Sequence, residues 1–134
     1  MASSMRVVCN VPSISISQST LNDIIELLTP DQLNVLAEKI ARKDLKIVKE
    51  NFDSFSNSVD AHLHYLNELA SKFQWGSLSF EHIDDKTILL VISPNCFATE
   101  KGAGFYQQIY INFMKLLNFE LASANMNRLM FRSR

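Results

Sequence analysis

The chain has 134 residues, a length that suits one domain, and its 47% hydrophobic and 20% charged residues are ordinary for a globular protein. Its formal net charge of −1 argues against a nucleic-acid-binding protein, because such proteins carry a basic excess on one face. The two cysteines lack the spacing of a disulfide framework, and no apolar run reaches the length of a membrane span, so we expect free thiols and a cytoplasmic protein without a signal peptide.

The N-terminal segment, residues 1–19, is rich in serine and contains Pro12. Around Ile14 and Ile16 it alternates polar and apolar residues, which is the pattern of a strand, but the stretch is short and terminal. We therefore predict an extended arm over 1–19 that becomes ordered against a partner or against the body of the protein. Residues 20–134 are predicted to form a single domain.

Apolar residues at helical spacing predict three helices in the first half of this domain. The first covers residues 21–28, with Ser19 or Thr20 as the candidate cap. Thr29 and Gln32 have the spacing of a capping box around Pro30, and a second helix follows to about residue 48. A polar connection over 51–58 leads to a third helix over 59–73.

The sequence pattern in the second half of the domain predicts a hairpin, a helix, and one or two final strands. Strands are expected over residues 77–83 and 87–92, with a turn at 84–86, and residues 93–104 are predicted to be a loop. A helix over 105–117 would end at Asn118, and residues 119–134 would hold one or two strands. The order helix-helix-helix-strand-strand-helix-strand predicts an α+β fold, with helices packed on a small antiparallel sheet.

No cluster of residues indicates catalysis, a metal or a cofactor, so we expect a protein that is not an enzyme. His64 and Glu68 can form an ion pair on a helix surface, but a metal site needs at least three ligands. Cys96 has no neighbour in the sequence that would activate its thiol except Lys101. The glycines after Lys101 match neither the Walker pattern nor the dinucleotide-binding pattern, and a loop with a tight turn is expected there.

Apolar side chains are more numerous than one small core requires, and interfaces use such a surplus. This surplus predicts self-association, although a domain of this size exposes some apolar surface in any case. The residues that we assign to an interface on this basis are Ile14, Ile16, Phe52, Phe55, Tyr106, Tyr110, Met126 and Met130.

Residues 58–69 and 73–81 resemble the D family of bacterial cellulose synthase subunits. In that family too, an amphipathic helix ends in a Trp-Gly pair, here Trp75-Gly76, and a strand of alternating residues follows and ends near a glutamate, here Glu81. The final strand, with Met130 and Arg132, also resembles that of the family. The resemblance covers roughly a third of the chain, and the middle loop and the last helix match less well. The wider fold is similar to vinyl-reductase-type and TRAPP-type domains.

This resemblance implies a non-catalytic accessory subunit of a cellulose synthesis and secretion complex. Its partners would be copies of itself, in an octamer built from dimers, other subunits of the synthase complex at the inner membrane, and glucan chains. The alternative is a small-ligand-binding sensor or carrier, with a pocket between the last helix and the sheet. An enzyme that uses Cys96 or His64 is the third and least favoured hypothesis.

Overall fold

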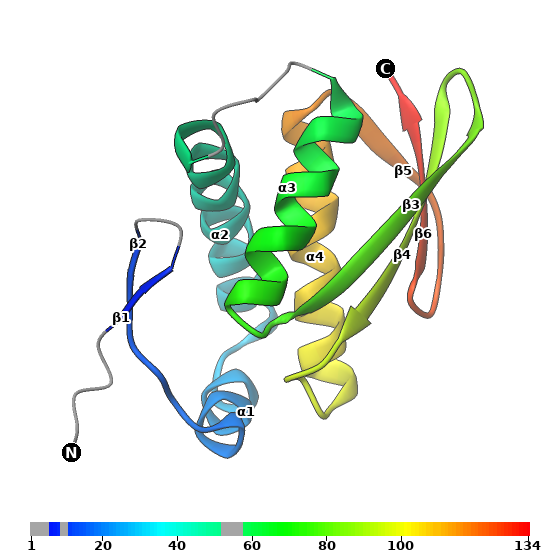
Figure 1. Cartoon of the computed structure of the whole chain (residues 1–134). Coiled ribbons are helices and arrows are strands. Elements are labelled where there is room, and N and C mark those ends of the chain that lie inside the picture. The colour runs from blue at the N-terminus through cyan, green and yellow to red at the C-terminus, as the bar shows by residue number, and fades with distance from the viewer. Residues whose placement is uncertain (1–5, 9–10, 52–57) are drawn as a thin grey trace.

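The structure is a computed structural model, and it describes residues 6–8, 11–51 and 58–134 (Figure 1). Two short strands come first in the chain, followed by three helices, a hairpin, a fourth helix and a second hairpin. The elements are β1 (Arg6–Val8), β2 (Val11–Ser13), α1 (Gln18–Leu27), α2 (Pro30–Asn51), α3 (Val59–Lys72), β3 (Gly76–Asp84), β4 (Thr87–Pro94), α4 (Glu100–Leu116), β5 (Phe119–Asn125) and β6 (Arg128–Ser133).

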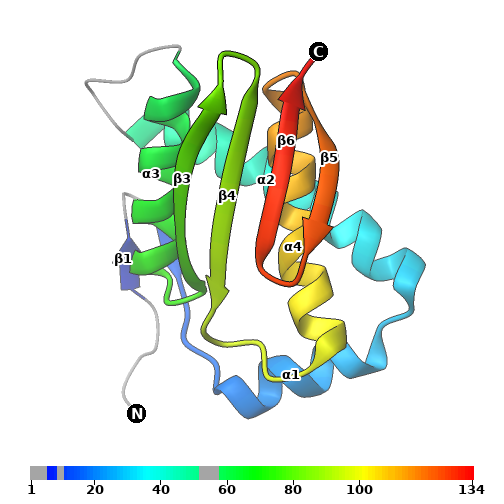
Figure 2. The ribbon, with the colours of Figure 1, turned by 90° about the vertical axis from the view of Figure 1, so that its right-hand side faces the viewer.

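The main sheet has four antiparallel strands in the order β3-β4-β6-β5 (Figure 2). Its central strand β4 pairs with β3 through a tight turn and with β6 from much later in the chain. The side chains of Ile88, Leu90 and Ile92 alternate along β4 and are almost completely buried. Alternation of this kind places one face of the sheet against the helices, as the strand pattern predicts.

The helices form two layers on this face of the sheet. α3 and α4 lie between the sheet and α2 (Figure 1). α4 is therefore covered on both sides, and eight of its residues are buried, which include Phe105 and Phe113. The predicted α+β fold, with helices packed on a small antiparallel sheet, is confirmed.

Side-chain caps fix the beginnings of the first two helices. The Thr29 hydroxyl accepts from the backbone N–H of Gln32 at 3.2 Å, and the Gln32 side chain accepts from the N–H of Thr29 at 2.9 Å, so the predicted capping box is confirmed. α1 begins earlier than expected, inside the predicted arm. Ser17 caps it in place of Ser19 or Thr20, because the Ser17 hydroxyl accepts from the N–H of Thr20 at 3.1 Å.

The connection from α3 to β3 is closed by a Schellman motif. Gln74 has a φ of 62°, its N–H donates to the carbonyl of Ser71, and the N–H of Trp75 donates to the carbonyl of Ala70. The left-handed residue just past the helix is thus Gln74, and Gly76 has a different role. Gly76 instead allows close packing, because a Cβ atom there would lie 2.2 Å from the Ser93 carbonyl oxygen.

α4 begins at Glu100, five residues before the predicted start, so the expected loop over 93–104 is wrong in its second half. Thr99 caps the helix, because its hydroxyl accepts from the N–H of Gly102 at 3.1 Å. Both glycines of this segment, Gly102 and Gly104, are helical. α4 ends at Leu116, one residue before the predicted end, and Asn118, with a φ of 67°, directly follows the C-cap residue Leu117.

Candidate functional site

A cavity of about 200 Å³ lies between α2, α3 and α4. It lies between the three helices, with one side open to solvent, and not between α4 and the sheet, where the small-ligand hypothesis places its pocket. Half of the described lining residues are aliphatic. The aliphatic lining residues are Ile40, Ile47, Leu66, Leu69, Ala70 and Ile109.

A carboxylate faces this apolar space. Asp44 of α2 lines the cavity between Ile40 and Ile47, on the stripe of α2 that faces the other helices. No hydrogen bond or ion pair joins it to any residue in the described part of the chain. Burial raises the pKa of Asp44 from 3.8 to about 7, because the ionised form loses hydration there. The carboxyl group of Asp44 therefore gains or loses a proton near neutral pH.

Two tyrosines of α4 form a hydrogen-bonded pair on the opposite wall. The hydroxyl oxygens of Tyr106 and Tyr110 lie 2.5 Å apart, and their rings meet edge to face with centroids 4.9 Å apart. Burial raises the pKa of Tyr106 to about 12 and that of Tyr110 further in the same direction, and the nearby Asp44 carboxylate adds to both shifts. Both phenols therefore stay protonated; one O–H donates to the other hydroxyl, and the second O–H can donate a hydrogen bond into the cavity.

The aromatic wall is completed by Phe73 and Trp75 at the end of α3. The Schellman motif at Gln74 turns the chain so that both flanking aromatic residues line the cavity. The ring of Phe97 packs edge to face against that of Trp75, with the ring centroids 5.7 Å apart. Lys43 of α2, an exposed residue, is the remaining polar residue among the described lining residues. The described lining thus combines six aliphatic residues, four aromatic rings and one carboxylate.

The residues assigned to an interface are found in different environments. Ile14, Ile16 and Met126 are exposed, Met126 to 83%, and Met130 is half-buried on β6. Tyr106 and Tyr110 are each only 2% exposed, because α2 and α3 cover the side of α4 that carries them, and they are not surface residues. The two remaining residues, Phe52 and Phe55, lie outside the described residues.

The other candidates for chemistry have structural environments. His64 and Glu68 form the predicted ion pair at 3.4 Å on an exposed face of α3. Burial raises the pKa of the Cys96 thiol, which disfavours the reactive thiolate. Within residues 6–8, 11–51 and 58–134, no three side chains of the metal-binding types come together. None of the helices in these ranges has the length and hydropathy needed to cross a membrane.

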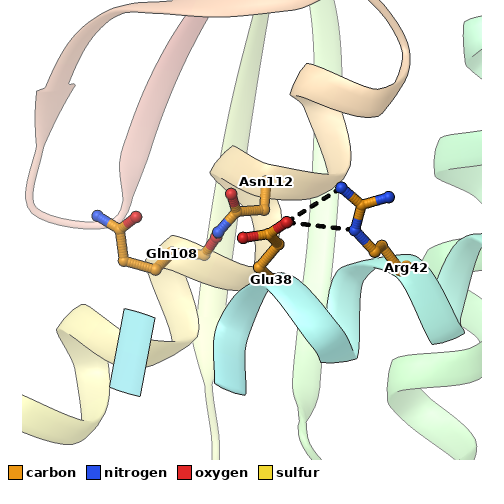
Figure 3. Close-up of polar contacts among 4 residues, drawn as sticks. All are labelled: Glu38, Arg42, Gln108 and Asn112. Atoms are coloured by element: carbon orange, nitrogen blue, oxygen red, sulfur yellow. Dashed lines mark hydrogen bonds and ion pairs between the residues drawn. The ribbon is translucent and has the colours of Figure 1, made fainter. Parts of the chain in front are cut away.

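Four polar residues lie along the outside of the α2–α4 contact: Glu38, Arg42, Gln108 and Asn112 (Figure 3). Glu38 accepts from both Nε and Nη2 of Arg42 at 3.3 and 3.0 Å, one helical turn apart on α2. On α4, the Asn112 side chain donates to the backbone carbonyl of Gln108 at 2.9 Å. Because each of these contacts stays within one helix and the ion pair is exposed, these four residues contribute little to stability and indicate no binding site.

No model of a known protein family matches the chain, and none of the curated proteins matches it either. Functional arguments for this protein therefore depend on its own residues.

Proposed function

We propose that the protein is a binding domain for a small, largely apolar molecule, held in the cavity between α2, α3 and α4. The observation that supports this proposal most is the Asp44 carboxylate, which faces an apolar space without a partner among the described residues. A buried charged group without a partner is costly, and such groups are typical of functional sites. The aliphatic and aromatic lining with a few polar groups is the usual composition of a ligand pocket.

The volume limits the size of the molecule. A dry cavity of about 150 Å³ in another protein holds benzene, so this one suits a ligand of roughly six to ten non-hydrogen atoms. Benzyl alcohol and benzylamine have this size and serve as probes. Calorimetric titration of the whole chain should show saturable binding of at least one of them, and the absence of binding by both would contradict the proposal.

Filling the cavity should abolish this binding. Ala70 lies on the cavity wall and is partly exposed, so Ala70→Leu places a larger apolar side chain in the space with little need for repacking. We expect the affinity for the probe to fall by at least about tenfold, because leucine occupies the volume that the ligand needs. Ala61→Leu on the same helix, outside the cavity, is the matched control. Equal loss in both variants would place the ligand elsewhere.

A second proposal is self-association as a non-catalytic accessory subunit, and exposed apolar side chains favour it. Ile14, Ile16, Leu27 and Met126 are each more than half exposed, and Met126 lies at the tip of the β5–β6 hairpin. Surfaces of this kind are used in symmetric oligomers. The specific role in cellulose synthesis, with an octamer and glucan chains as partner, depends on the resemblance of residues 58–81, and it stays a prediction.

Met126 offers a test of self-association. It has a φ of 56° in the two-residue turn between Asn125 and Arg128, where glycine is preferred. Met126→Gly should leave the free energy of unfolding unchanged or raise it by up to about 1 kcal/mol, because glycine relieves the left-handed strain. If Met126 packs against another copy, sedimentation should show a smaller assembly for this variant. Asn127→Gly, in the same turn, is the control, and an unchanged mass for Met126→Gly would exclude Met126 from the interface.

A further inference from the structure

We infer that the ligand of the cavity is an organic ammonium ion, which pairs with the Asp44 carboxylate and packs against the aromatic wall. This inference rests on the proposed binding function and specifies its chemistry. It is supported by the arrangement of the described lining residues, of which four of twelve are aromatic and one is a carboxylate.

The carboxylate needs a positive partner that the described residues do not supply. Lys43 is the cation next to it in the lining, but it is exposed, and no ion pair joins the two side chains. Removing a carboxylate from water is unfavourable unless a cation or hydrogen-bond donors compensate for the lost hydration. A ligand ammonium group would supply both the charge and the N–H donors.

The aromatic residues suit the same ligand. Phe73 and Trp75 come from the end of α3, and Tyr106 and Tyr110 come from α4, so rings line the cavity from two elements. The face of an aromatic ring attracts a cation, and desolvated sites strengthen this attraction. The combination of rings with one carboxylate favours a cation over a neutral or an anionic molecule, because an anion would be repelled by Asp44.

The charged and titratable groups around Asp44 are few. Lys43 lies on its own helix, and Tyr106 and Tyr110 lie on α4, where burial keeps both phenols protonated. Among the described lining residues, those that α3 contributes are not titratable and none is a histidine. Asp44, with a pKa of about 7, is therefore the group expected to change charge between pH 5.5 and 8.

The inference predicts a pH-dependent affinity. The ammonium ion binds the ionised form of Asp44, so its affinity should rise by up to about 30-fold from pH 5.5 to pH 8 and then level off. Benzyl alcohol has the same size and shape as benzylamine but no charge, so its affinity should not rise with pH. Calorimetric titration of the whole chain with both probes at four or five pH values measures this difference.

Two variants test whether Asp44 and Lys43 determine the affinity for benzylamine and its dependence on pH. Asp44→Asn keeps the shape of the cavity and should reduce benzylamine affinity at pH 8 by at least about tenfold and remove its pH dependence. Lys43→Gln removes a repelling charge from the lining and should strengthen benzylamine binding a few-fold. Neither change should alter the affinity for benzyl alcohol by more than about twofold.

The results of these titrations distinguish a failure of the ammonium inference from a failure of the proposed binding function. Equal binding of both probes without pH dependence would overturn the ammonium ligand and leave the binding cavity in place. Tighter binding of benzoate than of benzylamine would also overturn it, because an anion would then be preferred. Absence of binding by both benzylamine and benzyl alcohol would contradict the binding function itself.

Discussion

Asp44→Asn should stabilise the protein at pH 8, and the gain should shrink as the pH falls towards 4. Burial raises the pKa of Asp44 from 3.8 to about 7, so in this interval the folded chain keeps a proton that the unfolded chain has released. Stability therefore falls as the pH rises from about 4 to 7, and asparagine removes this loss. Because Asp44 keeps some contact with solvent, we expect the stability difference to grow by about 2 to 4 kcal/mol between pH 4 and pH 8.

Chemical denaturation of both chains at several pH values measures this difference. Asp23→Asn on the exposed side of α1 is the control, and its effect should stay within about 0.5 kcal/mol at every pH. A constant difference between the Asp44→Asn variant and the parent chain would mean that the pKa of Asp44 is the same in the folded and the unfolded state. That result would also remove the basis for a pH-dependent ligand affinity.

Gly76→Ala should be strongly destabilising. A Cβ atom at Gly76 would lie 2.2 Å from the Ser93 carbonyl oxygen and 2.7 Å from the Tyr106 hydroxyl, and Gly76 has a φ of 157°. The Ser93 atom belongs to the backbone of the paired strand, so it cannot move without breaking the β3–β4 register. We expect a loss of about 3 kcal/mol or more in the free energy of unfolding.

Gly104→Ala is the matched comparison and should have the opposite sign. Gly104 lies in α4, and a Cβ atom added there would have no other atom within 4 Å; alanine favours a helix over glycine by about 0.5 to 1 kcal/mol. Thermal unfolding of both variants should therefore shift the midpoint in opposite directions. If Gly76→Ala were tolerated, the close contact between β3, β4 and Tyr106 would be wrong, and with it the position of one wall of the cavity.

Much of the fold follows from local patterns. The capping box at Thr29 and Gln32 specifies the start of α2, and the alternation in β3 and the apolar run in β4 predict the central hairpin. The start of α4 could not be predicted in this way. Gly102 and Gly104 favour a loop by propensity, but the Thr99 cap and the packing of Gly102 against Phe97 stabilise a helix.

The cavity between α2, α3 and α4 could not be predicted from the sequence, for a different reason. Asp44 directly follows Arg42 and Lys43, and such a run of charges is typical of the solvated C-terminal half of a helix. Its spacing from Ile40 and Ile47, however, places it on the apolar face, and a carboxylate at such a position is a signal that sequence inspection could have used. The burial of Tyr106 and Tyr110 depends on a second layer of helices over α4, which no local pattern reveals.

The strand order β3-β4-β6-β5 has a consequence for synthesis on the ribosome. β4 is the most apolar strand, and its second edge pairs with β6, yet residues 95–127 separate the two strands in the chain. Until Arg128–Ser133 has emerged, the nascent chain carries an open, hydrophobic strand edge, which is a template for aggregation. A chaperone that shields residues 87–94 during this interval would raise the yield of folded protein.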